Sequence, residues 1–239
     1  GVSEMAQSAC AQQNLVELDR AIGGAFRQSY RDYLAPESPW PAAMFSDTLV
    51  MASPVEGVGG EGFAISGLIS QACPLQLRLS EHGFFARGSI TLGDFYIRDE
   101  LVFGPALVEA YHLERERAIH PRMILSTKVR DVHVRNLKDN AATEGVPLAT
   151  LLLCDRDGLA FLNYLEFLLD EPDDPRPRLA AHRDALAGKL ATYGDNSRVW
   201  EKYRWVAEYH NHFCNKRMPS NNELLIPDVD LAQELRPVI

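Results

Sequence analysis

Two charged residues stand where a charge is costly, and they are the first candidates for chemistry. Asp47 lies between two short apolar stretches, residues 42–46 and 48–53. Arg87 lies among hydrophobic residues in an alternating stretch, residues 84–92. An unpaired cation on such a strand is unfavourable, so Arg87 either pairs with a structural acid or contacts an anionic ligand. Asp47 is either a hairpin-turn aspartate or part of a site.

Other clusters of potential metal ligands are less specific. His210, His212 and Cys214 are spaced two apart, and residues two apart on a helix point to different faces. Asp155-Arg156-Asp157-Gly158 lacks the later acidic ligands of a calcium loop and predicts a hairpin turn. The charged connection around Asp94 is either a solvated loop or a source of one more metal ligand.

Composition excludes several classes of protein. The chain has 239 residues, 46% hydrophobic and 24% charged, which is typical of a globular domain and not of a disordered chain. With 24 Lys and Arg against 33 Asp and Glu, the net charge of −9 disfavours nucleic acid as a partner but allows a small anion held by metal ions. No apolar run approaches the ~20 residues of a membrane span. Four scattered cysteines predict buried thiols, and we expect a cytoplasmic protein without membrane association.

The elements that must position these residues follow from periodicity and turn signals. A helix is expected over residues 3–34, a second over 63–82 with an interruption at Pro74, a third from Pro105, and helical structure beyond Pro177, with a polar tail after Phe213. Strands are expected at residues 42–46, 48–53, 84–92, 101–103, 123–125, 148–154 and 159–164, with a polar connection at 93–100. Strands interleaved with helices predict an α/β fold, specifically an α+β sandwich. We expect a catalytic core over residues 1–170 and a helical appendage over 171–239.

The stretch from Phe45 to Ser126 resembles a known family. It reads F-S-D-T-L-V-M-A-S, then a helix, then A-R-G-S-I-T-L-G, V-F-G-P-A-L-V-E-A-Y-H-L-E and P-R-M-I-L-S. This order is similar to that of the class III nucleotidyl cyclase fold, and most like the short bacterial pyrimidine cyclases of the Pycsar anti-phage systems. The resemblance covers about a third of the chain and implies a mostly antiparallel sheet flanked by helices.

The resemblance also implies site residues. The family's metal-binding hairpin aspartate falls on Asp47, and Arg87 would meet the triphosphate. Two divalent ions, Mn²⁺ or Mg²⁺, would bind the triphosphate and activate the ribose 3′-hydroxyl. The family's other metal aspartate belongs to an Asp-x-x-Gly pattern whose glycine would be Gly1. Gly1, Val2 and Ser3 would then cradle the phosphates at a helix start, and a first strand would precede the sequence shown.

Departures from the family pattern concern base recognition. The lysine and aspartate that read a purine fall on Ala43 and Leu101, whose side chains cannot hydrogen-bond a base. The transition-state asparagine and arginine fall on Val108 and His112. A protonated His112 could donate one bond to phosphate, and Tyr111 could stack on a base.

These features imply an enzyme that converts a pyrimidine nucleoside triphosphate, UTP before CTP, to the 3′,5′-cyclic monophosphate in anti-phage defence. The resemblance further implies a head-to-tail homodimer with two sites at its interface. Two alternatives stay open: a cyclase acting on ATP or GTP, and a catalytically silent cyclase-like domain that binds a nucleotide or a partner protein.

Overall fold

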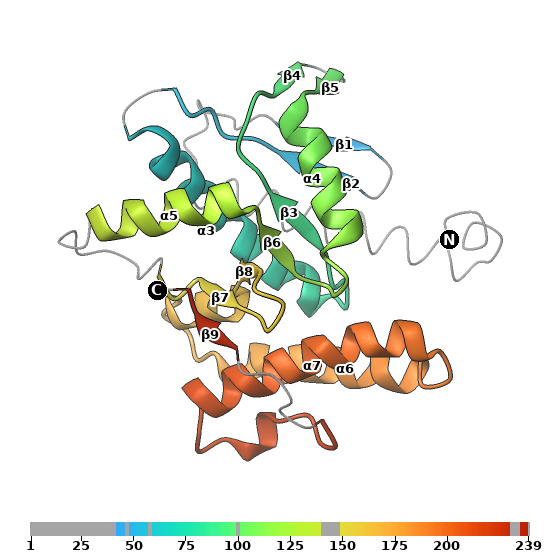
Figure 1. Ribbon diagram of the computed structural model, residues 1–239. Helices are drawn as coiled ribbons and strands as arrows, with labels where there is room; N and C mark the ends of the chain where they lie inside the picture. Colours follow the sequence, from blue (N-terminus) through green and yellow to red (C-terminus); the bar gives the residue numbers. More distant parts are fainter. Residues whose placement is uncertain are drawn as a thin grey trace.

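The computed structural model describes residues 42–45, 48–56, 59–98, 101–139, 149–229 and 235–238. In this part of the chain a mixed sheet is flanked by helices (Figure 1), as the interleaved pattern predicts. No helix among these residues is long and apolar enough to cross a membrane.

The main sheet has five strands in the order β3-β6-β8-β7-β9. Only β3 and β6 run parallel, with Ser89 opposite Ile124, and the other three pairings are antiparallel. The expected mostly antiparallel sheet is therefore present. The strands span Gly88–Ile90 (β3), Met123–Leu125 (β6), Leu152–Cys154 (β7), Ala160–Leu162 (β8) and Arg236–Pro237 (β9).

Two antiparallel hairpins stand apart from this sheet. The first joins β1 (Ala42–Phe45) to β2 (Thr48–Met51). The second joins β4 (Tyr96–Arg98) to β5 (Leu101–Phe103). The β1–β2 hairpin is held by a small apolar cluster on helix α3, which comprises Leu75 and Leu79 with Leu49, Met51, Phe84 and Ala86 against them.

Helix α3 (Gly60–Glu81) is the central helix, and thirteen of its residues are buried. It packs against α5, α6 and the 3₁₀ helix η1. Burial on several sides explains its weakly amphipathic sequence, because a helix covered all round needs no polar face. The remaining helices span Pro105–Glu116 (α4), Thr127–Asp139 (α5), Tyr164–Leu169 (η1), Arg176–Thr192 (α6), Ser197–Arg217 (α7) and Asn222–Leu224 (η2).

The structure corrects several expected boundaries. Helix α3 runs through Pro74 without interruption; proline removes one backbone donor, but the residue is buried within the packed helix. The stretch 84–92 forms a ladder only at residues 88–90, because β6 offers partners only there. The expected polar connection contains strand β4, which pairs with β5. Helix α5 was not expected. The tail after Phe213 is not polar throughout, since Leu224 and Ile226 are buried.

The hydrophobic core continues across the expected boundary at residue 170. One cluster joins Ile69 of α3, Phe161 of β8 and Leu165 of η1 to Leu179 of α6 and Tyr209 of α7. Helices α6 and α7 lie side by side below the sheet (Figure 1) and contribute buried residues directly to this cluster.

Candidate functional site

The unit formed by β3, the β4–β5 hairpin and α4 positions most of the described candidate residues. Strand β3 is joined to α4 by two side-chain hydrogen bonds on its polar face. The Ser89 hydroxyl donates to the Ala110 carbonyl at 2.7 Å, and the Thr91 hydroxyl donates to the Ala106 carbonyl at 2.8 Å. The helix therefore lies on the strand with its register set by Ser89 and Thr91.

Gly104 allows α4 to begin where it does. Its φ is 143°, and a Cβ at this position would lie 2.6 Å from the Asp94 backbone oxygen. The same oxygen accepts a hydrogen bond from the Ala106 N–H at 3.2 Å. Pro105 follows at the first helical position, where its missing N–H costs nothing. Only glycine combines this backbone conformation with so close an approach.

Arg87 is paired with a structural acid in this structure. Its guanidinium forms an ion pair with Glu114 of α4 and donates to the Ala118 carbonyl at 3.5 Å. The Arg87 side chain is 40% exposed, so part of it is accessible to solvent. Of the two roles left open by the sequence, the structural pairing is the one observed.

Tyr111 and His112 are brought together on the exposed side of α4. Their rings meet edge to face at 5.8 Å between centroids. Arg115, one turn along, donates to the Tyr111 hydroxyl at 3.1 Å. The His112 Nδ1 atom lies 3.2 Å from a Glu116 carboxylate oxygen. This surface offers an aromatic face, an imidazole and a guanidinium, which are groups able to contact a base and a phosphate.

The other predicted site residues lie on the two hairpins or outside the described residues. Leu101 lies on β5 opposite Arg98, with its side chain exposed. Ala43 lies on β1 opposite Val50. Asp47, the predicted metal ligand, lies outside the described residues, as do Gly1, Val2 and Ser3.

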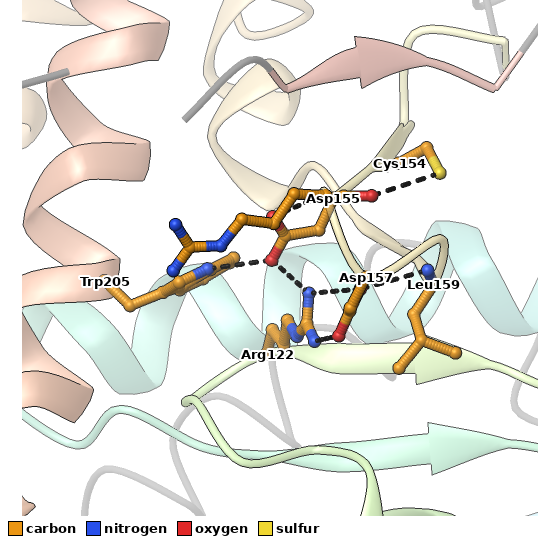
Figure 2. Close-up of polar contacts among 7 residues, drawn as sticks. Arg122, Cys154, Asp155, Asp157, Leu159 and Trp205 are labelled. Atoms are coloured by element: carbon orange, nitrogen blue, oxygen red, sulfur yellow. Dashed lines mark hydrogen bonds and ion pairs between the residues drawn. The ribbon is translucent and has the colours of Figure 1, made fainter. Parts of the chain in front are cut away.

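A second polar cluster, which the sequence did not predict, surrounds Arg122 (Figure 2). Arg122 precedes β6 and is 1% exposed. Its guanidinium forms ion pairs with Asp155 and Asp157 of the turn between β7 and β8. The Trp205 indole N–H of α7 donates to Asp155 at 2.9 Å, and Arg122 lies over the Trp205 ring at 5.3 Å.

The turn that carries these two aspartates was predicted correctly. The Gly158 N–H donates to the Asp155 carbonyl at 2.9 Å, and the Leu159 N–H to the Asp157 carboxylate at 3.1 Å. Gly158 has a φ of 78°, which favours glycine. What the sequence could not reveal was Arg122, 33 residues away from Asp155. The only local signal was a cation directly before a short apolar strand.

The Arg122 cluster is better suited to holding the fold together than to binding metal. Arg122 forms ion pairs with both carboxylates, and the Trp205 indole N–H donates to an oxygen of Asp155. His120 stacks on Trp205 at 5.4 Å; burial, followed by the Arg122 charge, lowers its pKa. Within the described part of the chain, no group of three or more His, Cys, Asp or Glu residues could hold a metal ion.

The described residues define a mixed α/β protein in which Tyr111 and His112 are exposed together on α4. No protein-family model, curated protein or solved structure matches the chain.

Proposed function

We propose that the protein is a metal-dependent nucleotide cyclase acting on a pyrimidine nucleoside triphosphate, UTP before CTP. The observation that carries the proposal is the unit in which β3 is followed by Gly104-Pro105 and by α4, with Tyr111 and His112 exposed together. This unit follows a hairpin and helix α3 and precedes β6, in the order that the sequence resemblance implies. Tyr111 and His112 are both exposed, with Arg115 and Glu116 as their neighbours on the helix.

The reaction forms one bond and breaks one. The ribose 3′-oxygen bonds to the α-phosphorus, the bond between that phosphorus and the bridging oxygen of the β-phosphate breaks, and pyrophosphate leaves with the electron pair. The hydroxyl proton passes to solvent or a base. In-line phosphoryl chemistry of this kind depends on positioning and charge neutralisation. In this proposal Tyr111 stacks on the base and His112 contacts a phosphate oxygen.

Divalent ions, Mn²⁺ or Mg²⁺, would supply charge neutralisation and acidify the 3′-hydroxyl when bound. Asp47 is the ligand that the resemblance assigns to them, and it lies outside the described residues. Among the described residues, no group of three or more His, Cys, Asp or Glu side chains could hold a metal ion. The expectation of two ions remains part of the proposal.

A homodimer is proposed from the exposed apolar residues of the β4–β5 hairpin and of α4, which together we call the hairpin–helix face. Its residues are between 41% and 58% exposed, and Tyr96 stacks near Phe103 at 4.9 Å between ring centroids. Exposed apolar groups concentrated on two adjacent elements are typical of an interaction surface. The face consists of Tyr96, Leu101 and Phe103 on the β4–β5 hairpin and Val108 and Tyr111 on α4.

A catalytically silent, cyclase-like domain is the second candidate, and one observation favours it. The Arg87 guanidinium is already held by Glu114 and the Ala118 carbonyl, so it is not free to meet a triphosphate. A cyclase acting on ATP or GTP stays possible as a third reading, because no described contact selects a base.

The deciding experiment incubates the full-length protein with each of the four nucleoside triphosphates and Mn²⁺. Pyrophosphate release and cyclic product are measured by chromatography and mass spectrometry. Cyclic UMP or cyclic CMP, lost in Asp47→Ala, is the expected result. A cyclic purine nucleotide as product would show that the substrate is ATP or GTP. Binding of a triphosphate without any product would favour the silent domain.

Glu114→Gln separates the two roles of Arg87. If Arg87 can turn to the triphosphate, removing the Glu114 charge frees it, and the Kd for the nucleotide falls several-fold. Arg130→Gln, which alters an exposed ion pair on α5 with Asp131, serves as the control. An unchanged Kd in Glu114→Gln would leave Arg87 with the structural role alone.

A further inference from the structure

A chain of neutral hydrogen-bonding groups is buried between η1, α6 and α7. The Tyr164 hydroxyl lies 2.8 Å from His182 Nε2, and His182 Nδ1 lies 3.0 Å from His210 Nδ1. His210 Nε2 lies 2.9 Å from the Leu224 carbonyl oxygen. The two rings stack at 5.0 Å between centroids, and both side chains are fully buried.

Burial favours the neutral form of both imidazoles, and the last contact then fixes the position of every proton in this chain. A carbonyl oxygen can only accept, so His210 Nε2 carries a hydrogen and donates to Leu224. His210 Nδ1 is then the acceptor, and His182 Nδ1 donates to it. His182 Nε2 in turn accepts from the Tyr164 hydroxyl. The two neutral imidazoles are therefore in opposite tautomers.

Adding a proton to this chain of hydrogen bonds requires the donors and acceptors to exchange roles. If His210 becomes a cation, its Nδ1–H donates to His182, which must then carry its own hydrogen on Nε2. The Tyr164 hydroxyl must turn to another acceptor. Burial raises the pKa of Tyr164, and a hydrogen bond with Ser80 acts in the opposite direction, so the Ser80 hydroxyl is within reach. A second added proton would set two N–H groups against each other across the 3.0 Å contact.

The surroundings disfavour a cation. The groups facing the pair include the rings of Phe85 on one side of His182, Tyr209 beside Tyr164 and the Cys214 thiol, 3.5 Å from His210 Nε2. The Arg183 charge opposes protonation of His210. Burial lowers the pKa of His210 to about 4, and burial followed by the His210 charge lowers that of His182 well below its ordinary value.

Charged groups nearby are already engaged. Arg183 donates to the Glu223 carbonyl of η2 and pairs with Asp184. A hydrogen bond from Asn221 chiefly lowers the pKa of the Glu223 carboxyl, and Arg183 contributes to the same shift. Glu166 is paired with Arg217. Burial chiefly raises the pKa of Tyr209, and the Glu166 charge adds a smaller increase. None of these pairings places a free carboxylate against the imidazoles.

The pair holds the segment that follows α7. His210 binds the Leu224 carbonyl, and the next residue, Asn211, clamps Ile226 through both groups of its amide. The Asn211 Nδ2 donates to the Ile226 carbonyl at 2.9 Å, and Asn211 Oδ1 accepts from the Ile226 N–H at 2.8 Å. Two consecutive side chains of α7 thus fasten residues 218–229 to the helix.

We propose that the His182–His210 contact is an acid-operated latch: at acid pH the contact opens and residues 218–229 leave helix α7, because the exposed histidines bind protons that the buried pair excludes, while the five-stranded sheet stays folded. The latch is independent of the proposed cyclase chemistry. Histidines exposed by opening take up protons near their ordinary pKa of about 6.5. The opening equilibrium constant therefore rises up to about tenfold per pH unit for each histidine concerned.

Hydrogen exchange of the full-length protein, corrected for the intrinsic pH dependence, tests this proposal. Between about pH 7 and about pH 5, amides of residues 218–229 are expected to lose at least tenfold more protection than those of β6 and β8. His210→Gln, whose amide can still donate to Leu224, is expected to reduce that pH dependence to the part that His182 contributes. His82→Gln, at the exposed end of α3, is the matched control. Equal loss of protection in segment and sheet would overturn the latch.

A second test uses the wild-type protein, so that its result does not depend on whether a variant folds. Imidazole nitrogen chemical shifts of the wild-type protein, labelled at histidine, report each tautomer directly. At about pH 7 one buried ring is expected to carry its hydrogen on Nδ1 and the other on Nε2. A cationic ring in the pair, or two identical tautomers, would overturn the proposal.

Discussion

Arg122 and Asp155 form an ion pair in which both side chains are almost completely buried, at 2% and 4% exposure. Arg122 also pairs with Asp157, and the Trp205 indole N–H donates to Asp155. Three segments therefore meet at one guanidinium: the start of β6, the turn between β7 and β8, and helix α7 (Figure 2). This relationship connects the sheet to the C-terminal helices.

Replacement of Arg122 should be strongly destabilising. Arg122→Met leaves the Asp155 carboxylate buried without its cation, and breaking such a pair costs about 3–5 kcal/mol. Urea unfolding of the variant measures this loss. Arg130→Met, which breaks an exposed pair with Asp131, should cost less than about 1 kcal/mol. Adding Asp155→Asn to Arg122→Met should restore part of the stability; similar costs for the two arginines would contradict the assignment.

Substitution of Gly104 should destabilise the start of α4. Gly104→Ala adds a Cβ that would lie 2.6 Å from the Asp94 oxygen, at a φ of 143°, and strain of this kind costs about 1–3 kcal/mol. Gly188→Ala in α6 is the matched control, because a Cβ there has no neighbour within 4 Å. The control should gain about 0.5–1 kcal/mol from helix propensity. Thermal unfolding compares the two variants, and an unaffected Gly104→Ala would refute the steric argument.

Acid should lower the free energy of unfolding through the buried histidines. Their folded-state pKa values are depressed, to about 4 for His210, whereas unfolded histidine titrates near 6.5. Between these values the unfolded chain binds more protons, so stability falls as pH falls, by up to about 1.4 kcal/mol per pH unit for each histidine. Urea titrations across this window measure the slope.

The same titrations on His210→Gln isolate the contribution of one imidazole. Its slope against pH should be shallower than that of the wild type, whatever the absolute stability of the variant. A wild-type slope that is unchanged by His210→Gln would assign the acid sensitivity to other groups.

A charge on the hairpin–helix face should dissociate the proposed dimer. Phe103→Asp places a carboxylate at an exposed apolar position that the dimer would bury without a partner, which is unfavourable. Sedimentation velocity should show a monomer. Phe63→Asp changes a phenylalanine on α3 that is more exposed than Phe103, at 67% against 53%, and should leave the dimer intact. A monomeric wild-type protein would contradict the dimer itself.

The local features of the fold were largely predictable. The hairpin turn at Asp155–Gly158, the helix start at Gly104-Pro105 and strand β6 depend on short-range turn chemistry and periodicity. Strand β4 was missed because charged residues interrupt its pattern, and its pairing depends on β5. The predicted interruption at Pro74 was wrong, since tertiary packing of α3 outweighed the cost of one missing donor.

For the candidate site residues, the sequence showed which side chains need a partner but not which residue that partner is. The sequence identified Arg87 as a cation that needs a partner, but Glu114 became its partner only when α4 packed on β3. Similarly, the sequence singled out His210 for its spacing from His212 and Cys214, but could not show that His210 faces His182 on a different helix.

The sequence alone determined the acidic composition, the interleaved strands and helices, and the order of motifs on which the cyclase proposal depends. These properties are local or cumulative along the chain. Tertiary structure decided which charges pair, that Arg122 contacts both Asp155 and Asp157, and that two histidines share one buried hydrogen bond. Such contacts join residues 28 to 35 positions apart, and the sheet order and helix packing that bring them together leave no periodic signal in the chain.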